Sequence, residues 1–467
     1  MIDPSDLFLP KAAIRNSHLE LFEGRKKLIS SAVEAISVAG AAMVLYGDRG
    51  VGKTSLAWQI MRILQGDLSI ARSLGIRLAF TPPPRKCVWL QCNRSMRDIE
   101  DMLISLMLSR TEAPCLRDLF PDAYSSNRDR RLKDLRVRNL RSDPEAEAER
   151  KSGAWAFEVR EAFNELLLQI RRLYRLPEII IFLDEFDTMS RRLSEPSIVQ
   201  NDGDDLLPHG SSSRPPRQRP TTGPLGLGDL IKTSEGARFV IIGVADDIGE
   251  LIIDHPSINR KLANSTFKIP GLLPEDFERM FDKTESLAPP GYLSFERGFR
   301  DLVIEQSDGI PWLFHLIGHV GVLQCLHDVN EDKRRFPLSL GREEFDRAVD
   351  DVLSPGAAAG VTDDPYRSDN LSKACRGSSS RETVLYSLAR SPSGWVPEEP
   401  IRKESSLSER AARDALKRLS EEFGILQSRI DPRSSRMEYR FADPIMRLFV
   451  RLAAHRGKGT LAGGSRA

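Results

Sequence analysis

The sequence contains no long apolar run and no recognisable targeting segment. Its longest apolar stretches, such as residues 179–183, are far shorter than the roughly 18 residues that a membrane-spanning helix needs. The N-terminal sequence Met1-Ile2-Asp3-Pro4 has no basic segment followed by an apolar core, so we expect no signal peptide. We therefore predict a cytoplasmic protein that does not contact a membrane.

Net charge and cysteine are also scarce. The 68 Lys and Arg residues nearly balance 67 Asp and Glu residues, and the net charge of +1 excludes a globally polybasic nucleic-acid coat. Any contact with nucleic acid must come from a local basic patch. Only Cys87 and Cys92 of the five cysteines lie close together in the sequence, and they fall within one expected strand. We interpret all five as reduced thiols with no metal site.

The 467 residues suffice for about three domains, and the first half alternates strand and helix patterns. The fully apolar stretch at residues 179–183 is typical of a strand buried in the middle of a parallel sheet. This alternation predicts an α/β fold. Helices are expected over residues 25–38, 53–64, 96–108 and 154–176, and strands over residues 42–46, 87–91, 179–183 and 238–244.

Changes in composition predict the domain organisation. An α/β core over residues 1–270 would carry a charged insertion at about 110–150 and a disordered loop at about 191–228, which is rich in Ser, Pro and Gly. For the insertion, solvated helices are favoured over a basic contact surface. The remaining predicted parts are a purely helical lid at 271–353, a linker at 354–380, a winged-helix domain at 381–456 and a disordered tail at 457–467.

A phosphate-binding loop is the most specific motif. Residues 47–54 read Gly-Asp-Arg-Gly-Val-Gly-Lys-Thr between an expected strand and an expected helix. The glycines let backbone N–H groups turn inward to phosphate oxygens, Lys53 would reach the β- and γ-phosphates, and the Thr54 hydroxyl would bind Mg²⁺. The expected nucleotide-binding residues of this loop are Gly47, Asp48, Arg49, Gly50, Val51, Gly52, Lys53, Thr54 and Ser55.

A second motif, IIIFLDEFD, occupies residues 179–187. An apolar strand that ends in Asp184 places a carboxylate at the mouth of the sheet, where it would hold Mg²⁺. Glu185 would polarise the attacking water, and Asp187 is favoured as a helix cap or a supporting group. No N-K-x-D motif for reading guanine is present, which favours ATP over GTP.

Together these motifs resemble the Walker A and Walker B motifs of AAA+ and STAND ATPases. Residues 21–25 (Leu-Phe-Glu-Gly-Arg) resemble the F-x-G-R motif of the Orc1/Cdc6-like and archaeal-type branch, which packs near the adenine. The resemblance covers residues 20–330. It implies an α/β P-loop NTPase, with a parallel sheet flanked by helices, followed by an α-helical lid and a winged-helix domain, with ATP and Mg²⁺ as cofactors.

The same resemblance implies further site residues. Residues 239–247 are similar to the sensor 1 strand, with Asp246 where Asn, Ser or Thr is usual. Arg260 matches an arginine finger that would act in a homo-oligomer assembled on ATP, although an ordinary surface arginine is the alternative. No sensor 2 arginine follows Gly309, and Pro311 instead resembles the STAND proline that packs on the base, with a simple first-turn helix proline as the alternative.

The C-terminal region resembles a winged helix, with helices at 381–388, 397–404 and 408–422 and a hairpin whose return strand is 437–441. Residues 376–456 hold 16 Lys and Arg against 11 Asp and Glu, a local net charge of 16 − 11 = +5. Contacts to double-stranded DNA are one interpretation, and protein contacts or autoinhibition are the other. The expected DNA-binding residues are Arg410, Arg413, Lys417, Arg418, Arg433 and Arg436.

These features predict an ATP-binding and ATP-hydrolysing switch, associated with DNA and a partner protein. Turnover is expected to be slow and stimulated by the partner or by assembly. The alternative is a signalling or defence STAND ATPase whose winged helix binds protein or inhibits the core. A chaperone-like remodeller is the weakest hypothesis, because no convincing pore-loop pair of an aromatic and an apolar residue is present.

Overall fold

The computed structural model describes most of the chain in a series of segments. The predicted disordered loop at about 191–228 and the predicted tail at 457–467 lie almost entirely outside the described residues. The described residues are 7–10, 13–15, 18–37, 42–93, 95–108, 115–124, 126–141, 143–150, 152–189, 227–245, 262, 264–331, 336–354, 371–391, 394–431 and 434–457.

The chain divides into two compact units. Residues 26–47 and 56–269 form the sheet unit. Residues 1–25, 48–55 and 270–467 form the second unit, which we call the lid unit. The phosphate loop and the N-terminal segment therefore group with the C-terminal half of the chain. The domain boundaries predicted from composition remain a prediction.

The sheet unit is built on five parallel strands in the order β2-β3-β4-β1-β5. Strand β3 lies in the interior of this order, and all six of its residues are buried. This explains its unbroken apolar sequence, because helices cover both faces of the sheet. The strands are β1 (Met43–Gly47), β2 (Lys86–Gln91), β3 (Ile179–Asp184), β4 (Ala237–Val244) and β5 (Thr266–Lys268).

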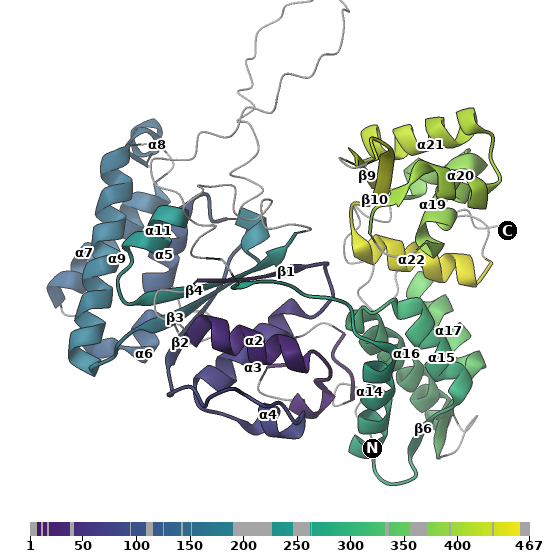
Figure 1. Cartoon of the computed structure of the whole chain (residues 1–467), viewed down its shortest axis with the longest axis horizontal. Helices are drawn as coiled ribbons and strands as arrows, with labels where there is room; N and C mark the ends of the chain where they lie inside the picture. The colour runs from purple at the N-terminus through teal and green to yellow at the C-terminus, as the bar shows by residue number, and fades with distance from the viewer. Residues whose placement is uncertain are drawn as a thin grey trace, which may run out of the picture. The chain divides into compact units, whose positions relative to one another are not determined.

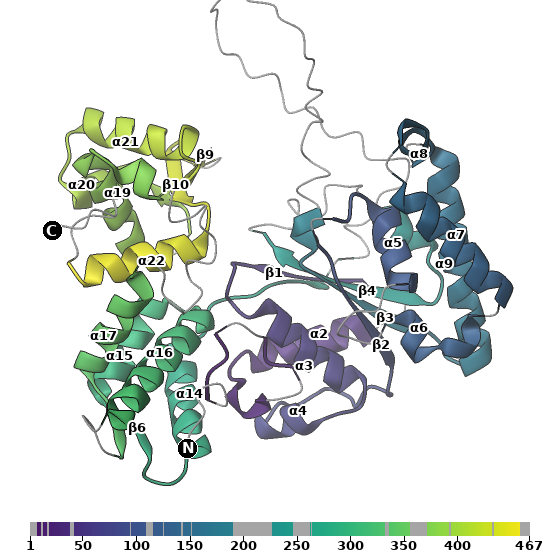
Figure 2. The ribbon, with the colours of Figure 1, turned by 180° about the vertical axis from the view of Figure 1, so that it is seen from behind.

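Helices α2 and α3 lie on one face of the sheet, and α5, α9 and α11 lie on the other (Figures 1 and 2). Alternate residues of β3 divide between the two faces, with Phe182 stacked on Trp89, which in turn stacks on Trp58 of α3. The opposite core contains Ile179, Ile181 and Leu183. The helices are α2 (Lys26–Ser37), α3 (Lys53–Leu64), α4 (Ser69–Ser73), α5 (Ile99–Leu108), α9 (Gly153–Tyr174) and α11 (Leu227–Thr233).

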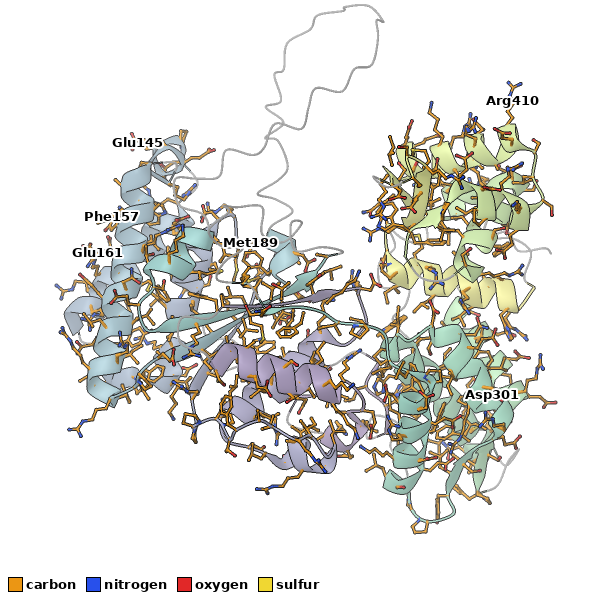
Figure 3. All side chains as sticks on the ribbon, in the orientation of Figure 1. Glu145, Phe157, Glu161, Met189, Asp301 and Arg410 are labelled. Atoms are coloured by element: carbon orange, nitrogen blue, oxygen red, sulfur yellow. The ribbon has the colours of Figure 1, made fainter. Side chains whose placement is uncertain are left out.

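The described residues of the charged insertion form helices, as favoured from its composition. Its arginines pair with acidic side chains: Arg131 with Glu161 and Glu165, at 3.0 and 2.9 Å, and Arg138 with Glu158, at 3.0 Å. Figure 3 shows Glu161 on the outside of α9. Such exposed pairs stabilise a solvated surface only weakly. The elements are α6 (Leu116–Leu119), η2 (Pro121–Ala123), α7 (Ser126–Leu140) and α8 (Pro144–Arg150).

The lid contains four long helices and also two short strands, so the prediction of a purely helical region was wrong. Each strand has three residues, too few for an alternating pattern to show in the sequence, and the two pair in parallel across 45 residues of chain (338 − 293). The elements are α14 (Pro274–Leu287), β6 (Leu293–Phe295), α15 (Arg297–Ser307), α16 (Pro311–Asn330), β7 (Leu338–Leu340) and α17 (Arg342–Leu353).

An N-terminal segment completes the lid core. Phe8 is fully buried and meets the rings of Phe314 and Phe295 with centroids 5.6 and 6.1 Å apart. Gly318 makes room for it, because a Cβ there would lie 2.1 Å from the Phe8 ring. The Trp312 indole N–H also donates to the carbonyl of Pro10 at 3.0 Å. Phe8 and Pro10 of the N-terminal segment therefore contact the lid core.

Replacing Phe8 with alanine is expected to lower the free energy of unfolding by about 3–5 kcal/mol, because the lid core would lose a fully buried ring. Phe80 provides a control, since it is 45% exposed and its replacement should change stability by no more than about 0.5 kcal/mol. Chemical denaturation of the two variants measures the difference. Equal, small losses for both would show that the N-terminal segment does not contribute to lid stability.

The winged helix forms in the order that the sequence predicts, with the three-stranded sheet β8-β10-β9 beside three helices. Ser408 caps α21, and its hydroxyl accepts a hydrogen bond from the N–H of Ala411 at 3.3 Å. Residues 371–375, which composition assigned to the linker, are helical and contribute Leu371 to this core. The elements are α19 (Ser379–Arg390), β8 (Val396–Pro397), α20 (Glu398–Ser405), α21 (Glu409–Glu421), β9 (Leu426–Ile430), β10 (Met437–Phe441) and α22 (Pro444–His455).

Helix α22 belongs to two hydrophobic cores. Leu448 and Leu452 pack in the lid core, whereas Val450 packs in the winged-helix core. Arg447 strengthens the junction, because it pairs with Asp308 of the lid at 2.6 Å and donates to the carbonyl of Ser391 at 2.5 Å. The winged helix is thus not an independent appendage of the lid.

Within the part of the chain that the structure describes, no helix combines the length and apolarity needed to cross a membrane. All five cysteines are buried and none is in a disulfide bond.

Candidate functional site

The phosphate loop connects β1 to α3, as its sequence context predicts. Its three glycines all adopt positive φ angles, 151° at Gly47, 78° at Gly50 and 88° at Gly52. Residues with a Cβ rarely adopt such angles, so the glycine spacing of the motif is a backbone requirement here. The loop ends where α3 begins at Lys53, and no acidic residue occupies the first turn of that helix. A helix N-terminus of this kind favours an anion.

Lys53 is positioned by the loop itself. Its side chain is largely buried, with 9% of the residue exposed. The ammonium group donates to the carbonyl oxygen of Asp48 at 2.8 Å, so the cation lies over the loop rather than in solvent. The hydroxyl of Ser55 accepts a hydrogen bond from the N–H of Ile14 at 3.0 Å, which ties the loop to the N-terminal segment.

The F-x-G-R motif supports the loop from one side. The Arg25 guanidinium donates to the carbonyl of Val51 and, at 3.2 Å, to the carbonyl of Pro270. Burial lowers the pKa of Arg25 to about 10, and the charge of Asp276 partly opposes that shift. The resemblance of this motif to F-x-G-R implies a position near the base, which remains a prediction. The contact of Arg25 with the loop backbone could not be read from the sequence, because it depends on how the chain folds back.

Glu23 anchors the same motif to the lid helix α14. Its carboxylate pairs with Lys283 at 2.6 Å and with Arg279 at 3.1 Å. Burial acts to raise the pKa of Glu23, but the hydrogen bonds from Lys283 and Arg279 outweigh it, and the pKa is lowered. Gly24 adopts φ 76°, and a Cβ there would lie 2.7 Å from an oxygen of Asp276. The motif therefore joins the phosphate loop to the lid.

The start of α16 lies against the same loop. Pro311 is the first residue of this helix, and its Cγ is 3.6 Å from the position of a Cβ on Gly52. In the same way, side-chain atoms of Ile310 and Trp312 lie 3.1 and 3.2 Å from the position of a Cβ on Gly50. Pro311 is thus both a first-turn proline and a neighbour of the phosphate loop, and its contact with a base remains a prediction. Asp308, at the preceding turn, is paired with Arg447.

In the sheet unit, β3 ends at Asp184, which is 4% exposed. Glu185 follows with a positive φ of 53° and is exposed. A non-glycine residue in this conformation is strained, and such residues concentrate at functional sites. Asp184 is buried and Glu185 is exposed, so the two adjacent carboxylates have different environments.

Asp187 has a structural partner. Its carboxylate accepts a hydrogen bond from the N–H of Val244 at 2.9 Å and so ties the turn after β3 to the end of β4. This agrees with the supporting role favoured from the sequence. Asp184, Glu185 and Asp187 all raise the pKa of the Cys92 thiol, after burial, which is the largest cause. The three carboxylates therefore gather at one edge of the sheet.

That edge is also where the phosphate loop begins. All strands are parallel, β4 lies between β1 and β3, and both Gly47 and Asp184 are the last residues of their strands. Carboxyl ends of parallel strands share one edge, where ligands of open α/β sheets bind. The carboxylates at the end of β3 are ligands of the kind that Mg²⁺ prefers, and the loop that follows β1 carries an amine and a hydroxyl of the kind that bind phosphates. The predicted residues Asp246, Arg260 and Arg433 lie outside the described residues.

In the winged helix, four of the predicted basic residues lie on α21, and Figure 3 shows Arg410 projecting from this helix. Arg413 pairs with Glu409 at 2.9 Å and Glu398 at 3.2 Å, and Arg418 approaches Asp414 at 3.6 Å. The helix is therefore less basic than its cations alone indicate. Arg436, on the hairpin, approaches Glu399 at 3.6 Å. Lys417 is exposed, like Arg410.

No protein-family model and no curated protein matches the sequence. Among solved structures, the chain is similar to the Aeropyrum pernix ORC1 protein in complex with DNA, at 15% identity and a TM-score of 0.43, with 97% of this chain and 96% of that chain covered. It is also similar to the Aeropyrum pernix ORC2 protein in ADPNP–ADP complexes, at 13% identity and a TM-score of 0.38, with 97% of this chain and 98% of that chain covered. Cdc6p from Pyrobaculum aerophilum matches at 12% identity and a TM-score of 0.38, with 98% of both chains covered.

Proteins of the Orc1/Cdc6 branch, which the sequence resemblance indicates, are thus among the structural matches over nearly the whole chain. The fold is an α/β P-loop fold followed by helical and winged-helix parts. At these identities, the residues of this chain must decide its function.

Proposed function

We propose that this protein is an ATP-dependent switch that binds and hydrolyses ATP. The observation that carries the proposal is the complete phosphate loop, with three glycines at positive φ between a parallel strand and a helix, and Asp184-Glu185 ending another strand of the same sheet. Backbone N–H groups and Lys53 would bind the phosphates, while Thr54 and Asp184 would hold Mg²⁺. The metal would neutralise charge on the phosphates, and Glu185 would orient and polarise the attacking water.

The nucleotide state would reach the rest of the lid unit through the loop. Arg25 and Pro311 both lie against it, and Glu23 ties the F-x-G-R motif to α14. A shift of the loop on binding phosphate therefore acts on the lid through packed contacts. The STAND-like proline and the AAA+ motifs both fit such a switch. Slow turnover, stimulation by a partner and an Arg260 finger in a homo-oligomer remain part of this proposal.

We further propose that the winged helix binds double-stranded DNA. Arg410 and Lys417 are exposed on α21, and the ion pairs of Arg413 and Arg418 are on the surface. Exposed pairs contribute about 1 kcal/mol or less, so a phosphate can replace the carboxylate at little cost. The contacts would be led by phosphates, with Arg436 of the hairpin contributing from the wing.

The combined replacement of Arg410 and Lys417 with alanine is expected to weaken duplex binding and to flatten its salt dependence by about one to two units, because each neutralised phosphate contributes a slope of about −0.9. Fluorescence anisotropy of a labelled duplex at several salt concentrations measures this slope. Arg297 of the lid is a matched control, since its side chain is 76% exposed and its loss should leave the slope unchanged. An unchanged slope in the double variant would argue against DNA contact through α21.

A signalling or defence ATPase with a winged helix that restrains the core is the second candidate. One observation favours it: Ile445 of α22 lies against the phosphate loop, with its Cδ1 3.0 Å from the position of a Cβ on Gly50. Removal of the whole winged helix does not test this candidate cleanly, because α22 also completes the lid core. Point substitutions are needed, and an Ile445→Ala variant that turns over ATP faster without any duplex binding by the parent would support the second candidate.

A further inference from the structure

Helices α7 and α9 of the sheet unit each carry an exposed stripe that mixes apolar and charged side chains. On α7 the stripe repeats every three or four residues and consists of Arg130, Lys133, Val137 and Leu140. On α9 it consists of Phe157, Glu161, Glu165 and Leu168. Val137, Leu140 and Phe157 are 62%, 71% and 63% exposed. Single exposed apolar side chains are ordinary, whereas several on one face indicate an interaction surface.

The two stripes lie on one surface of the sheet unit. Leu135 on the opposite side of α7 and Leu166 on the opposite side of α9 are fully buried in the same core. Both helices also pack on α5. Because each helix turns its buried side to that core, the exposed stripes face outward together. Figure 3 shows Phe157 and Glu161 on the outside of α9.

Ion pairs fix how the stripes run past each other. Arg131, in the middle of α7, pairs with Glu165 at 2.9 Å, whereas Arg138, near the end of α7, pairs with Glu158 at 3.0 Å. The two helices are therefore antiparallel. The apolar end of the α7 stripe lies beside the beginning of α9, which carries Phe157, so the exposed apolar side chains gather at one end of the helix pair.

The stripes have opposite charge. The exposed charged residues of α7 are three basic and one acidic, a net charge of 3 − 1 = +2: Arg130, Lys133, Arg136 and Asp134. Over residues 153–168 of α9, the exposed charged residues are the two carboxylates Glu161 and Glu165. These two share one cation, Arg131, so negative charge remains on α9. Among the described residues, Arg130 pairs with no carboxylate.

We propose that the two stripes bind a second copy of the chain through a two-fold axis. The same surface of each copy meets itself in such an interface, so the α7 stripe of one copy lies against the α9 stripe of the other. Opposite charges then meet at both contacts, and the exposed apolar side chains become covered. A surface with one sign of charge would repel its own copy, so the opposite charges of the stripes favour a second copy as the occupant.

Sedimentation velocity of the full-length protein without nucleotide, over a range of protein concentrations, tests the proposal. The parent is expected to show a reversible monomer–dimer equilibrium. Phe157→Ala should raise the dimer dissociation constant by about tenfold or more, because a buried aromatic ring often contributes a large share of the affinity of an interface. Phe80→Ala is a matched control, since Phe80 is 45% exposed but lies outside both helices, and it should leave the constant unchanged.

Charge reversal distinguishes a second copy from any other occupant. Arg130→Glu with Lys133→Glu makes both stripes negative, and Glu161→Lys with Glu165→Lys makes both positive. Each double variant should be monomeric by itself, because like charges then meet at both contacts. An equimolar mixture should dimerise again, because every stripe meets one of opposite charge. All four sites are exposed, so both variants should keep the parental circular dichroism spectrum.

Other results would overturn the proposal. A parent that is monomeric at about 100 μM has no such interface, because even weak specific contacts associate at that concentration. Reversed variants that stay monomeric when mixed would exclude pairing of α7 with α9 between copies. The proposed dimer needs no nucleotide, unlike the assembly proposed with Arg260. A dimer that forms only with ATP, is lost in Arg260→Ala and is unaffected by Phe157→Ala would therefore assign self-association to that other contact.

Discussion

Replacement of Lys53 with alanine is expected to remove most ATP binding, with the dissociation constant rising by about 100-fold or more. The Lys53 ammonium group is largely buried and lies 2.8 Å from the carbonyl of Asp48, at the loop that would surround the phosphates. It therefore meets the nucleotide as a desolvated charge, and its loss removes more than one charge-assisted hydrogen bond. Calorimetric titration with ATP in the presence of Mg²⁺ measures the change.

Lys86 offers a matched control for this experiment. It is the exposed first residue of β2, at the opposite end of the strand from the edge that carries the proposed site. Lys86→Ala removes the same charge and should bind ATP like the parent. If Lys53→Ala also binds like the parent, with a folded circular dichroism spectrum, the loop is not a nucleotide site.

The elements of the sheet unit could be predicted because each carries a local signal. Residues 53–64 were predicted as a helix and form α3 with the same bounds, and β3 differs from its prediction by one residue, Asp184. The winged-helix hairpin likewise has β10 at the expected residues 437–441. Periodicity, glycine spacing and caps act over a few residues and are visible in one sequence.

Long-range packing set the limits of the prediction. Strands β6 and β7 have three residues each and exist only because they pair with each other. The burial of Phe8 in the lid core depends on Gly318, which is 310 residues away in sequence (318 − 8) and shows no local sign of this role. The composition of residues 371–375 resembles a linker, yet Leu371 and Cys375 are buried in the winged-helix core.

The candidate site likewise has features that local sequence predicts and features that long-range packing determines. The spacing of glycines with Lys53 and the Asp184-Glu185 pair are local patterns, so the sequence alone predicts the proposed chemistry. Partner choice among charged residues could not be predicted: Arg413 meets Glu398 of another helix, and Arg447 meets Asp308 of the lid. A count of Lys and Arg therefore overestimated the positive charge that α21 presents, because the count ignores which carboxylates lie beside each cation.

The replacement of Glu185 with glutamine is expected to preserve ATP binding but to slow hydrolysis by about 100- to 10,000-fold, the range of a lost general base. Glutamine has nearly the same shape, so the positive φ of 53° at this position is strained to the same degree in both proteins. The amide cannot accept the proton of the attacking water. Phosphate release under single-turnover conditions measures the chemical step, and titration with ATP measures binding in the same variant.

Substitutions of two neighbouring carboxylates, Asp184 and Asp187, distinguish a loss of catalysis from a loss of metal binding and from a loss of stability. Asp184→Asn should weaken Mg²⁺-dependent ATP binding, because it alters the carboxylate that would hold the metal, whereas Glu185→Gln should not. Asp187→Asn should mainly affect stability, since Asp187 accepts the N–H of Val244 at 2.9 Å. Hydrolysis by Glu185→Gln at the parental rate would exclude Glu185 as the base. In that case a different group must activate the water, and Asp246, which follows β4 in the sequence, becomes the residue to replace next.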